Sequence, residues 1–95
     1  MKQALIVEEK VYEGIMDYAH GGGSTIKRLI IEGENNLAIT PHGDQLYAFA
    51  EYDLKRGKII GKIEVPDELV EKALNFVKSQ EEFYKIKEEV ETLLK

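Results

Sequence analysis

Residues 45–65 carry the clearest two-residue alternation of apolar and polar positions in the chain, and this period is typical of a strand with one buried face. In the second half of the stretch, Ile59, Ile63 and Val65 alternate with Lys58, Lys62 and Glu64. Between the halves, Lys55-Arg56-Gly57 has the composition of a short loop, with a glycine that tolerates positive φ. We therefore expect a β-hairpin over 45–65, at the centre of the only sheet.

The first half of this predicted hairpin directs its side chains to two faces. Leu46, Ala48, Ala50 and Tyr52 share one face, and Tyr47 and Phe49 share the other. Stacking on nucleic-acid bases is a poor explanation for these aromatics, because Glu51 and Asp53 lie on the Tyr47–Phe49 face and would repel phosphates. We expect core packing or a partner groove, with Tyr47, Phe49 and Tyr52 as candidate binding residues.

The N-terminal residues predict a short strand followed by a helix. Residues 4–7 are apolar, and Glu8 and Glu9 would open the helix, because carboxylates suit the positive end of a helix dipole. Helical spacing then places Val11, Tyr12, Ile15, Met16, Tyr18 and Ala19 on one stripe. We expect this helix to end at His20 and Gly21.

The middle of the chain predicts two further strands joined by polar turns. The loop Gly21-Gly22-Gly23-Ser24 lacks the pattern of a phosphate-binding loop, which leaves a native flexible connector or an engineered linker. A strand over 25–32 contains the apolar triplet 29–31, for which we expect burial on both faces. A shorter strand follows over 37–40, and Pro41 ends it or places it at a sheet edge.

The C-terminal third is helical, with a change of phase near Ser79. Pro66 would start the helix, and Ser79 with Glu82 matches a capping box. A first stripe contains Leu69, Val70, Ala73, Leu74, Phe76 and Val77, and a second contains Phe83, Ile86, Val90 and Leu93. The pattern predicts two helices with a bend, or one long helix with a break. We expect the narrow second stripe to form a homodimer interface.

These elements predict one α+β domain over residues 1–95, with the order β-α-β-β-β-β-α-α. The sheet would be small and antiparallel, with four to five strands in an order that the sequence leaves open, and with helices packed on one face. Residues 79–95 would form the C-terminal helix used for dimerisation.

Composition excludes several kinds of site. The chain has 95 residues and no cysteine, so disulfides, thiolate zinc sites and thiol nucleophiles are excluded. A net charge of −5 argues against nucleic acid as a partner, since phosphate binding needs converging Lys or Arg. The sequence has no targeting segment or membrane-spanning run, so we expect a cytoplasmic protein without membrane contact. Abundant Glu and Lys with few Asn and Gln suit a thermophile.

Candidate chemistry is sparse. His42 and Asp44, in the turn Pro41-His42-Gly43-Asp44, have the residue types of a weak metal site or of a base held by a carboxylate. No spacing marks the further ligands that a metal needs, so we predict no metal, cofactor or catalytic residue. We therefore expect a non-enzymatic interaction module that dimerises and binds another protein. The alternatives are nucleic-acid binding through the strand face that carries Lys and Arg, and a hydrolase or metal-dependent site at His42-Gly43-Asp44.

Overall fold

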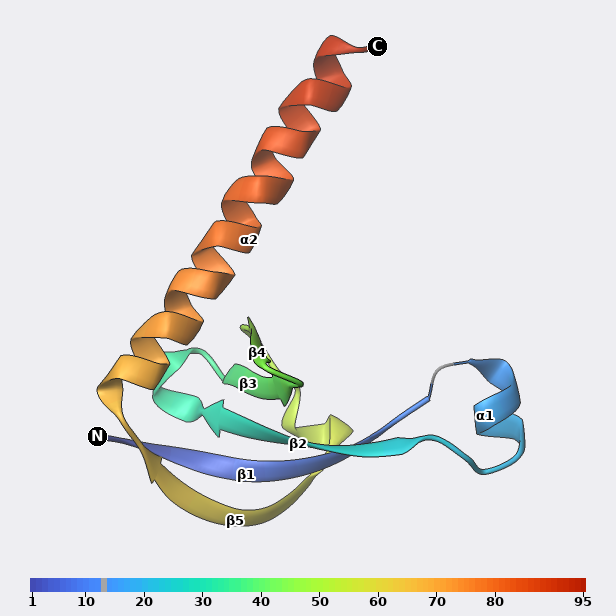
Figure 1. Ribbon diagram of the computed structural model, residues 1–95, viewed down its shortest axis with the longest axis vertical. Coiled ribbons are helices and arrows are strands. Elements are labelled where there is room, and N and C mark those ends of the chain that lie inside the picture. The colour runs from blue at the N-terminus through green and yellow to red at the C-terminus, as the bar shows by residue number, and fades with distance from the viewer. Residues whose placement is uncertain (13) are drawn as a thin grey trace.

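A computed structural model describes residues 1–12 and 14–95, and for Asp17, Tyr18 and His42 it describes the backbone alone. The described residues form one antiparallel sheet and a long C-terminal helix (Figure 1), which confirms the predicted α+β class. The strands are β1 (Lys2–Val11), β2 (Ser24–Ile31), β3 (Leu37–His42), β4 (Gln45–Phe49) and β5 (Lys58–Val65). The helices are α1 (Ile15–Ala19) and α2 (Asp67–Leu93), and short 3-10 turns span η1 (Glu32–Glu34) and η2 (Leu54–Arg56).

The predicted central hairpin over 45–65 is wrong, because its two arms lie at opposite edges of the sheet. The strand order is β4-β3-β2-β1-β5, with β4 paired to β3 and β5 paired to β1. The ten-residue β1 pairs with β2 on one side and with β5 on the other, so β1, β2 and β3 occupy the interior. Pro41 does not end β3, which continues to His42. The proline is tolerated because the register with β2 covers residues 37–39, so the missing N–H of Pro41 lies beyond that ladder. Residues 50–57, which connect the two edges, cross one face of the sheet instead of turning tightly.

The turn chemistry of this connection explains the difference. The carboxylate of Asp53 accepts a hydrogen bond from the Lys55 N–H at 3.0 Å, which closes η2. Gly57 is extended, with a φ of −134°, so it does not supply the positive φ of a two-residue hairpin. The side chains of Tyr52 and Leu54 pack instead against the sheet face below.

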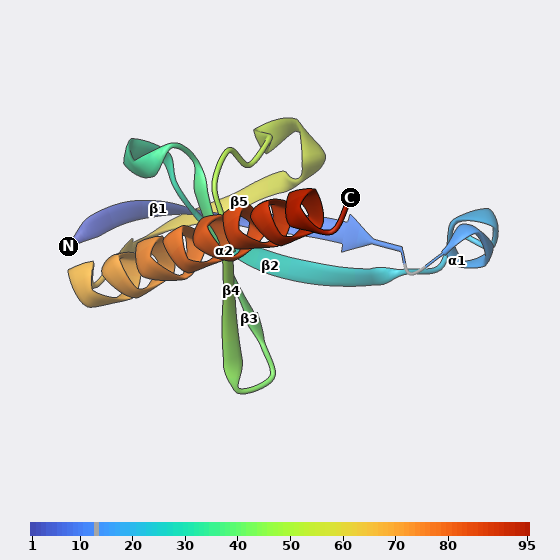
Figure 2. The same cartoon turned by 90° about the horizontal axis from the view of Figure 1, so that it is seen from above.

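The first predicted helix is also shorter than expected. β1 continues through Glu8 and Glu9 to Val11, and α1 contains only five residues. Glu9 stays in the strand because its side chain is buried on the sheet face and paired with Arg28 of β2. α1 lies at the outer end of the β1–β2 arm, remote from α2 (Figures 1 and 2), and Ile15 is 86% exposed. Of the stripe residues expected there, the side chain of Tyr18 lies outside the described part of the chain.

Both faces of the sheet carry buried apolar residues. On the face under α2, the sheet residues Ala4, Ile31, Leu37, Ile39, Ala48 and Val65 pack against Val70 and Ala73 of α2. The opposite face includes Leu5, Val7, Ile30, Ala38 and Tyr52. Ile30 and Ile31 belong to different faces, so the prediction that the triplet 29–31 is buried on both faces is confirmed. α2 covers part of one face, and residues 50–57 cover part of the other. The predicted shared face of Ile59, Ile63 and Val65 is wrong, because a bulge at Ile60 shifts the register. Val65 is buried, but Ile59 and Ile63 remain 49% and 47% exposed.

The C-terminal segment is one uninterrupted helix, not two. α2 starts after Pro66, and Ser79 lies inside it as an exposed residue, not as a cap. Its proximal half packs on the sheet through the buried Val70 and Ala73, with Leu69, Phe76 and Val77 partly buried beside them. Every residue from 78 to 95 is exposed, because the distal half leaves the sheet (Figures 1 and 2).

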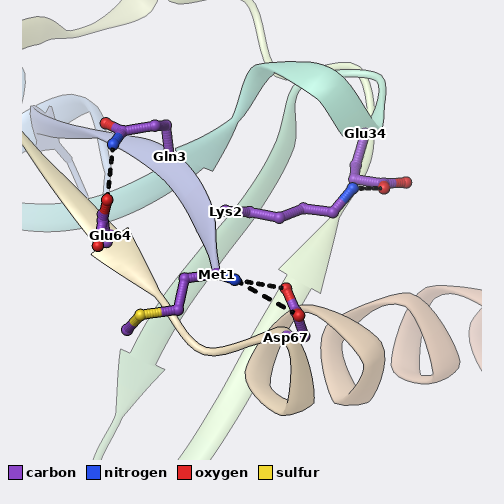
Figure 3. Close-up of polar contacts among 6 residues, drawn as sticks. All are labelled: Met1, Lys2, Gln3, Glu34, Glu64 and Asp67. Carbon is purple, nitrogen blue, oxygen red and sulfur yellow. Dashed lines mark hydrogen bonds and ion pairs between the residues drawn. The ribbon is translucent and has the colours of Figure 1, made fainter.

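Polar contacts join the start of α2 to the N-terminal strand (Figure 3). The N-terminal ammonium of Met1 lies 3.4 Å from Oδ1 of Asp67, and Gln3 donates to Glu64 of β5 at 3.3 Å. Lys2 pairs with Glu34 of η1. Exposed contacts of this kind stabilise by at most ~1 kcal/mol each, and among these three it is the Met1–Asp67 pair that reaches α2.

Candidate functional site

A groove of about 510 Å³ lies between the edge strand β4 and α2. β4 is the outermost strand on its side of the sheet, and α2 approaches it because Phe76 and Val77 pack on the same apolar cluster as Leu46 and Ala48. The lining residues are Asn35, Tyr47, Ala48, Phe49, Ala50, Glu51, Phe76, Val77, Gln80, Glu81 and Tyr84. This groove is the candidate functional site.

An aromatic contact bridges the two walls. The rings of Tyr47 and Phe76 meet edge to face, with centroids 6.0 Å apart and planes at 83°. This arrangement suits the ring quadrupoles and contributes about 1 kcal/mol beyond the buried area. The Tyr47 hydroxyl donates to Oε1 of Gln45 at 3.4 Å, and the Tyr47 side chain remains 44% exposed. A partner in the groove would therefore meet an ordered aromatic surface.

The groove follows the edge of the strand, not one of its faces. Successive side chains of a strand point to opposite faces. The last three residues of β4, 47–49, and the next two residues of the chain all line the groove, so its floor includes the C-terminal part of the β4 backbone edge. Backbone N–H and C=O groups on the outer side of an edge strand have no strand to pair with. The site therefore offers main-chain hydrogen bonds beside apolar side chains.

The groove lining includes two carboxylates and an unusual backbone conformation. Glu51 and Glu81 both line it, and no Lys or Arg does. Glu51 has a φ of 60°, in the left-handed region that non-glycine residues rarely adopt. Its N–H donates to the Asn35 carbonyl at 2.9 Å, and Asn35 is itself left-handed, with a φ of 57°. These contacts hold a negative charge at the point where the chain leaves β4.

A second polar cluster lies on the sheet face opposite α2. Glu9 accepts a hydrogen bond from Arg28 Nε at 2.7 Å, and its other carboxylate oxygen lies 2.9 Å from Arg56 Nη2. Arg28 also donates to Oγ1 of Thr40 at 2.6 Å, and its guanidinium lies 5.2 Å from the Phe49 ring centroid. The cluster fastens residues 50–57 to the sheet, and both arginines are committed to it.

Tyr52 lies inside this cluster, away from the groove. Its ring centroid is 5.8 Å from the guanidinium carbon of Arg28 and 5.5 Å from that of Arg56. Its buried hydroxyl has no hydrogen-bond partner among the described residues. Burial raises the pKa of Tyr52 above its usual value, and the negative charge of Glu9 raises this pKa further. Tyr52 is therefore a packing residue held in its neutral form.

The sequence-predicted binding residues are only partly brought together. Tyr47 and Phe49 line the groove, but Tyr52 faces the opposite cluster, because β4 ends at Phe49 and the left-handed Glu51 redirects the chain. Asp44 is exposed in the β3–β4 turn. The side chain of His42 lies outside the described residues. Within the described part of the chain, no group of three or more His, Cys, Asp or Glu is placed to hold a metal.

The α2 wall of the groove was missed by sequence reasoning. Phe76, Gln80 and Tyr84 recur every four residues, which places them on one helix face. That spacing is a usable signal, but nothing in the sequence indicates that this face approaches β4. The contribution of Asn35 is equally hidden, because it comes from a turn that precedes β3.

The residues predicted for dimerisation lie outside the groove, on the distal half of α2. Phe83, Ile86, Val90 and Leu93 are 62%, 60%, 48% and 84% exposed, and we call them the distal seam. With about 100° of rotation per residue, the seam points roughly 120° away from the stripe centred on Ala73 that packs on the sheet. The seam therefore does not face the sheet that the proximal half of α2 covers.

No helix among the described residues is long and apolar enough to span a bilayer. Comparison with protein-family models, with curated proteins and with solved structures gives no match. The proposals that follow therefore rest on the geometry of this chain alone.

Proposed function

We propose that this protein is a non-enzymatic interaction module that forms a homodimer through the distal seam and binds another protein. The observation that carries the proposal is the exposure of Phe83, Ile86, Val90 and Leu93 on a helix that has left its own sheet. Exposed apolar surface of this extent is typical of an interaction site. The cytoplasmic location expected from the sequence belongs to the same proposal.

The direction of the seam supports a partner outside the chain. α2 is continuous, so the roughly 120° offset between the seam and the sheet-facing stripe is fixed by the helix itself. No bend brings the seam back to the sheet. Two seams packed together would leave each sheet on the side away from the other copy, so the sheets would not collide.

The charges beside the seam favour a second copy in parallel orientation. With Phe83 and Val90 as a positions and Ile86 and Leu93 as d positions, Glu82 is a g residue and Lys87 is an e residue. In a parallel pair, a g residue faces the e residue of the next heptad on the other helix. Glu82 of each copy would then face Lys87 of the other.

The cluster around Glu9 weighs against nucleic-acid binding as the main function. Arg28 and Arg56, two of the basic residues on which that alternative depends, both bind the Glu9 carboxylate. A phosphate would have to displace this carboxylate from a nearly buried site. Lys58 and Lys62 remain exposed on β5, where lysines also protect a sheet edge from pairing.

Sedimentation equilibrium of the full chain over a concentration series tests the proposal. We expect a dimer at high micromolar concentration and a monomer for Val90→Glu, which places a charge in the seam. Lys85→Gln is the matched control, because it makes the same change in net charge at an exposed position outside the seam. Circular dichroism checks that each variant keeps its fold. A wild-type chain that stays monomeric at high micromolar concentration would overturn the proposal.

A further inference from the structure

We infer that the groove between β4 and α2 binds an extended, basic and apolar peptide segment of another protein, which adds to the sheet beside β4. This inference names the site and the partner chemistry for the protein-binding part of the proposed function. It does not depend on the dimer, because the groove and the distal seam lie on different faces of α2. The two faces adjoin at Phe83 and Tyr84, whose ring centroids are 5.9 Å apart.

The two edges of the sheet are protected differently, and this contrast carries the argument. On β5, a bulge at Ile60 interrupts the pairing with β1, and Lys58 and Lys62 flank it. Bulges and edge lysines are the usual features that prevent another strand from pairing. β4 (Gln45–Phe49) contains no charge, no proline and no glycine, and its register with β3 is regular. The β4 edge is therefore the one that can accept a strand.

The groove has the two parts that strand addition requires. The backbone edge of β4 supplies the main-chain hydrogen bonds, and a side wall receives every second side chain of the added strand. That wall is apolar and aromatic, from Phe76, Val77 and Tyr84 of α2. The groove volume of about 510 Å³ is large enough for side chains of a bound segment.

The charges of the groove indicate which segment it takes. Glu51 and Glu81 line it without any basic residue, so a Lys or Arg on the bound segment would neutralise them. A second copy of β4 is not the favoured occupant, because Gln45–Phe49 brings no cation to these carboxylates. The partner is therefore a protein segment that alternates apolar residues with Lys or Arg.

The test titrates the full chain with an acetylated hexapeptide of alternating lysine and valine. Amide hydrogen exchange is the site readout. We expect saturable binding and protection gained within residues 45–49, at the alternate residues whose N–H groups point away from β3. A second peptide, with the same residues in separate lysine and valine blocks, controls for charge alone. A third, N-methylated on alternate residues, lacks the donors that strand addition needs, and we expect it not to bind.

Variants of the two carboxylates locate the charge recognition. Glu51→Gln and Glu81→Gln should each weaken binding about threefold, as expected for a partly exposed ion pair. Glu89→Gln makes the same charge change outside the groove and should leave the affinity unchanged. Binding that is equal for the alternating and block peptides, or protection that appears on β5, would overturn the inference.

These experiments test the homodimer and the peptide site independently of each other. Val90→Glu should bind the alternating peptide as tightly as the wild-type chain does. A chain that dimerises but does not bind the peptide would overturn only the present inference. Protection of residues 45–49 that rises with protein concentration without peptide, and persists in Val90→Glu, would assign β4 to a second copy and also overturn it.

Discussion

Oε2 of Glu9 lies 2.7 Å from Nε of Arg28, and both side chains are nearly buried, at 5% and 10% exposed. The two residues stand on adjacent strands, where Glu9 is opposite Ile26 and Arg28 is opposite Val7, so they are diagonal neighbours on one face. This pair explains why β1 remains extended where the sequence pattern favours a helix. A helix starting at Glu8 would remove Glu9 from Arg28 and leave a buried guanidinium without its carboxylate.

The geometry of this pair predicts that Arg28→Lys destabilises the protein. A lysine ammonium is a point charge, and it cannot bind Glu9 and Thr40 together with the planar fork of a guanidinium. We expect the free energy of unfolding to fall by about 2 kcal/mol, measured by denaturant titration. Arg56→Lys is the matched comparison, because Arg56 is half-exposed, and its loss should stay below ~1 kcal/mol. Equal losses for the two variants would contradict this account.

The close approach of residues 50–57 to the sheet predicts a large effect for Gly57→Ala. An added Cβ at Gly57 would lie 2.4 Å from Cγ1 of Val7 and 2.8 Å from the hydroxyl oxygen of Tyr52. Val7 is fully buried in β1, which is paired on both sides with β2 and β5, so it cannot move away from the added Cβ. The clash can therefore be relieved only if residues 50–57 move. We expect a loss of about 2 kcal/mol in the free energy of unfolding.

Gly33→Ala provides the control for this substitution. An added Cβ at Gly33 meets nothing within 4 Å, so the change should stay within about 0.5 kcal/mol. Thermal unfolding of both variants measures the difference directly. An unchanged melting temperature for Gly57→Ala would mean that residues 50–57 do not pack on the sheet as described.

The buried hydroxyl of Tyr52 has no hydrogen-bond acceptor among the described residues, and Tyr52→Phe removes it. We therefore expect this variant to be as stable as the wild-type chain at neutral pH, or more stable by up to about 1 kcal/mol.

The raised pKa of Tyr52 also predicts that the stability of the wild-type chain falls at alkaline pH. The unfolded chain loses the tyrosine proton near its ordinary pKa of about 10, while the folded state still holds it. The contribution to stability is therefore complete below that pH and is lost as the pH rises through the folded-state pKa.

Melting temperatures between pH 8 and 11 test this sign. Tyr52→Phe should lose less stability than the wild-type chain as the pH rises above ~10. Tyr84→Phe makes the same substitution at an exposed position and serves as the control. A parallel decline for wild type and Tyr52→Phe would show that the Tyr52 proton does not contribute.

The sheet shows which part of a fold a local pattern encodes. Alternation over 45–65 correctly marked two strands, but it could not identify their neighbours, because strand pairing depends on the whole set of strands. The strand order depends on the length of β1, which the sequence pattern underestimated because Glu8 and Glu9 are polar. A glutamate in a strand is expected to be exposed, and the burial of Glu9 follows only from its pairing with Arg28.

The C-terminal helix illustrates a different limit. The phase shift near Ser79 is real, and the sequence pattern interpreted it as a break in the helix. α2 instead continues, and the shift turns the apolar surface from the chain's own sheet toward solvent. Periodicity reports which residues share a face, but it does not report what covers that face. For the same reason, the sequence predicts only part of the groove beside β4. Tyr47 and Phe49 could be identified as binding candidates, but the residues of the α2 wall could not.

The proposed parallel pairing of α2 makes a prediction that also reports orientation. Glu82→Lys would place two lysines together at each Glu82–Lys87 contact, and it should weaken the dimer about fivefold for two exposed contacts. Lys87→Glu should weaken it similarly, and the double variant should recover the wild-type affinity. Glu88→Lys changes the net charge equally at an outward-facing f position, so it should leave the affinity unchanged.

In an antiparallel pairing, Glu82→Lys would have the opposite effect on the affinity of the dimer. This pairing would bring Glu82 near Glu89 of the other copy, so Glu82→Lys would then strengthen the dimer. Sedimentation equilibrium of the four chains at low and high salt distinguishes the two orientations, because salt screens exposed charge pairs and should reduce every difference. Stronger association of Glu82→Lys at low salt would reject the parallel arrangement while keeping the seam as the interface. Identical association constants for all four chains would mean that these charges do not flank the contact.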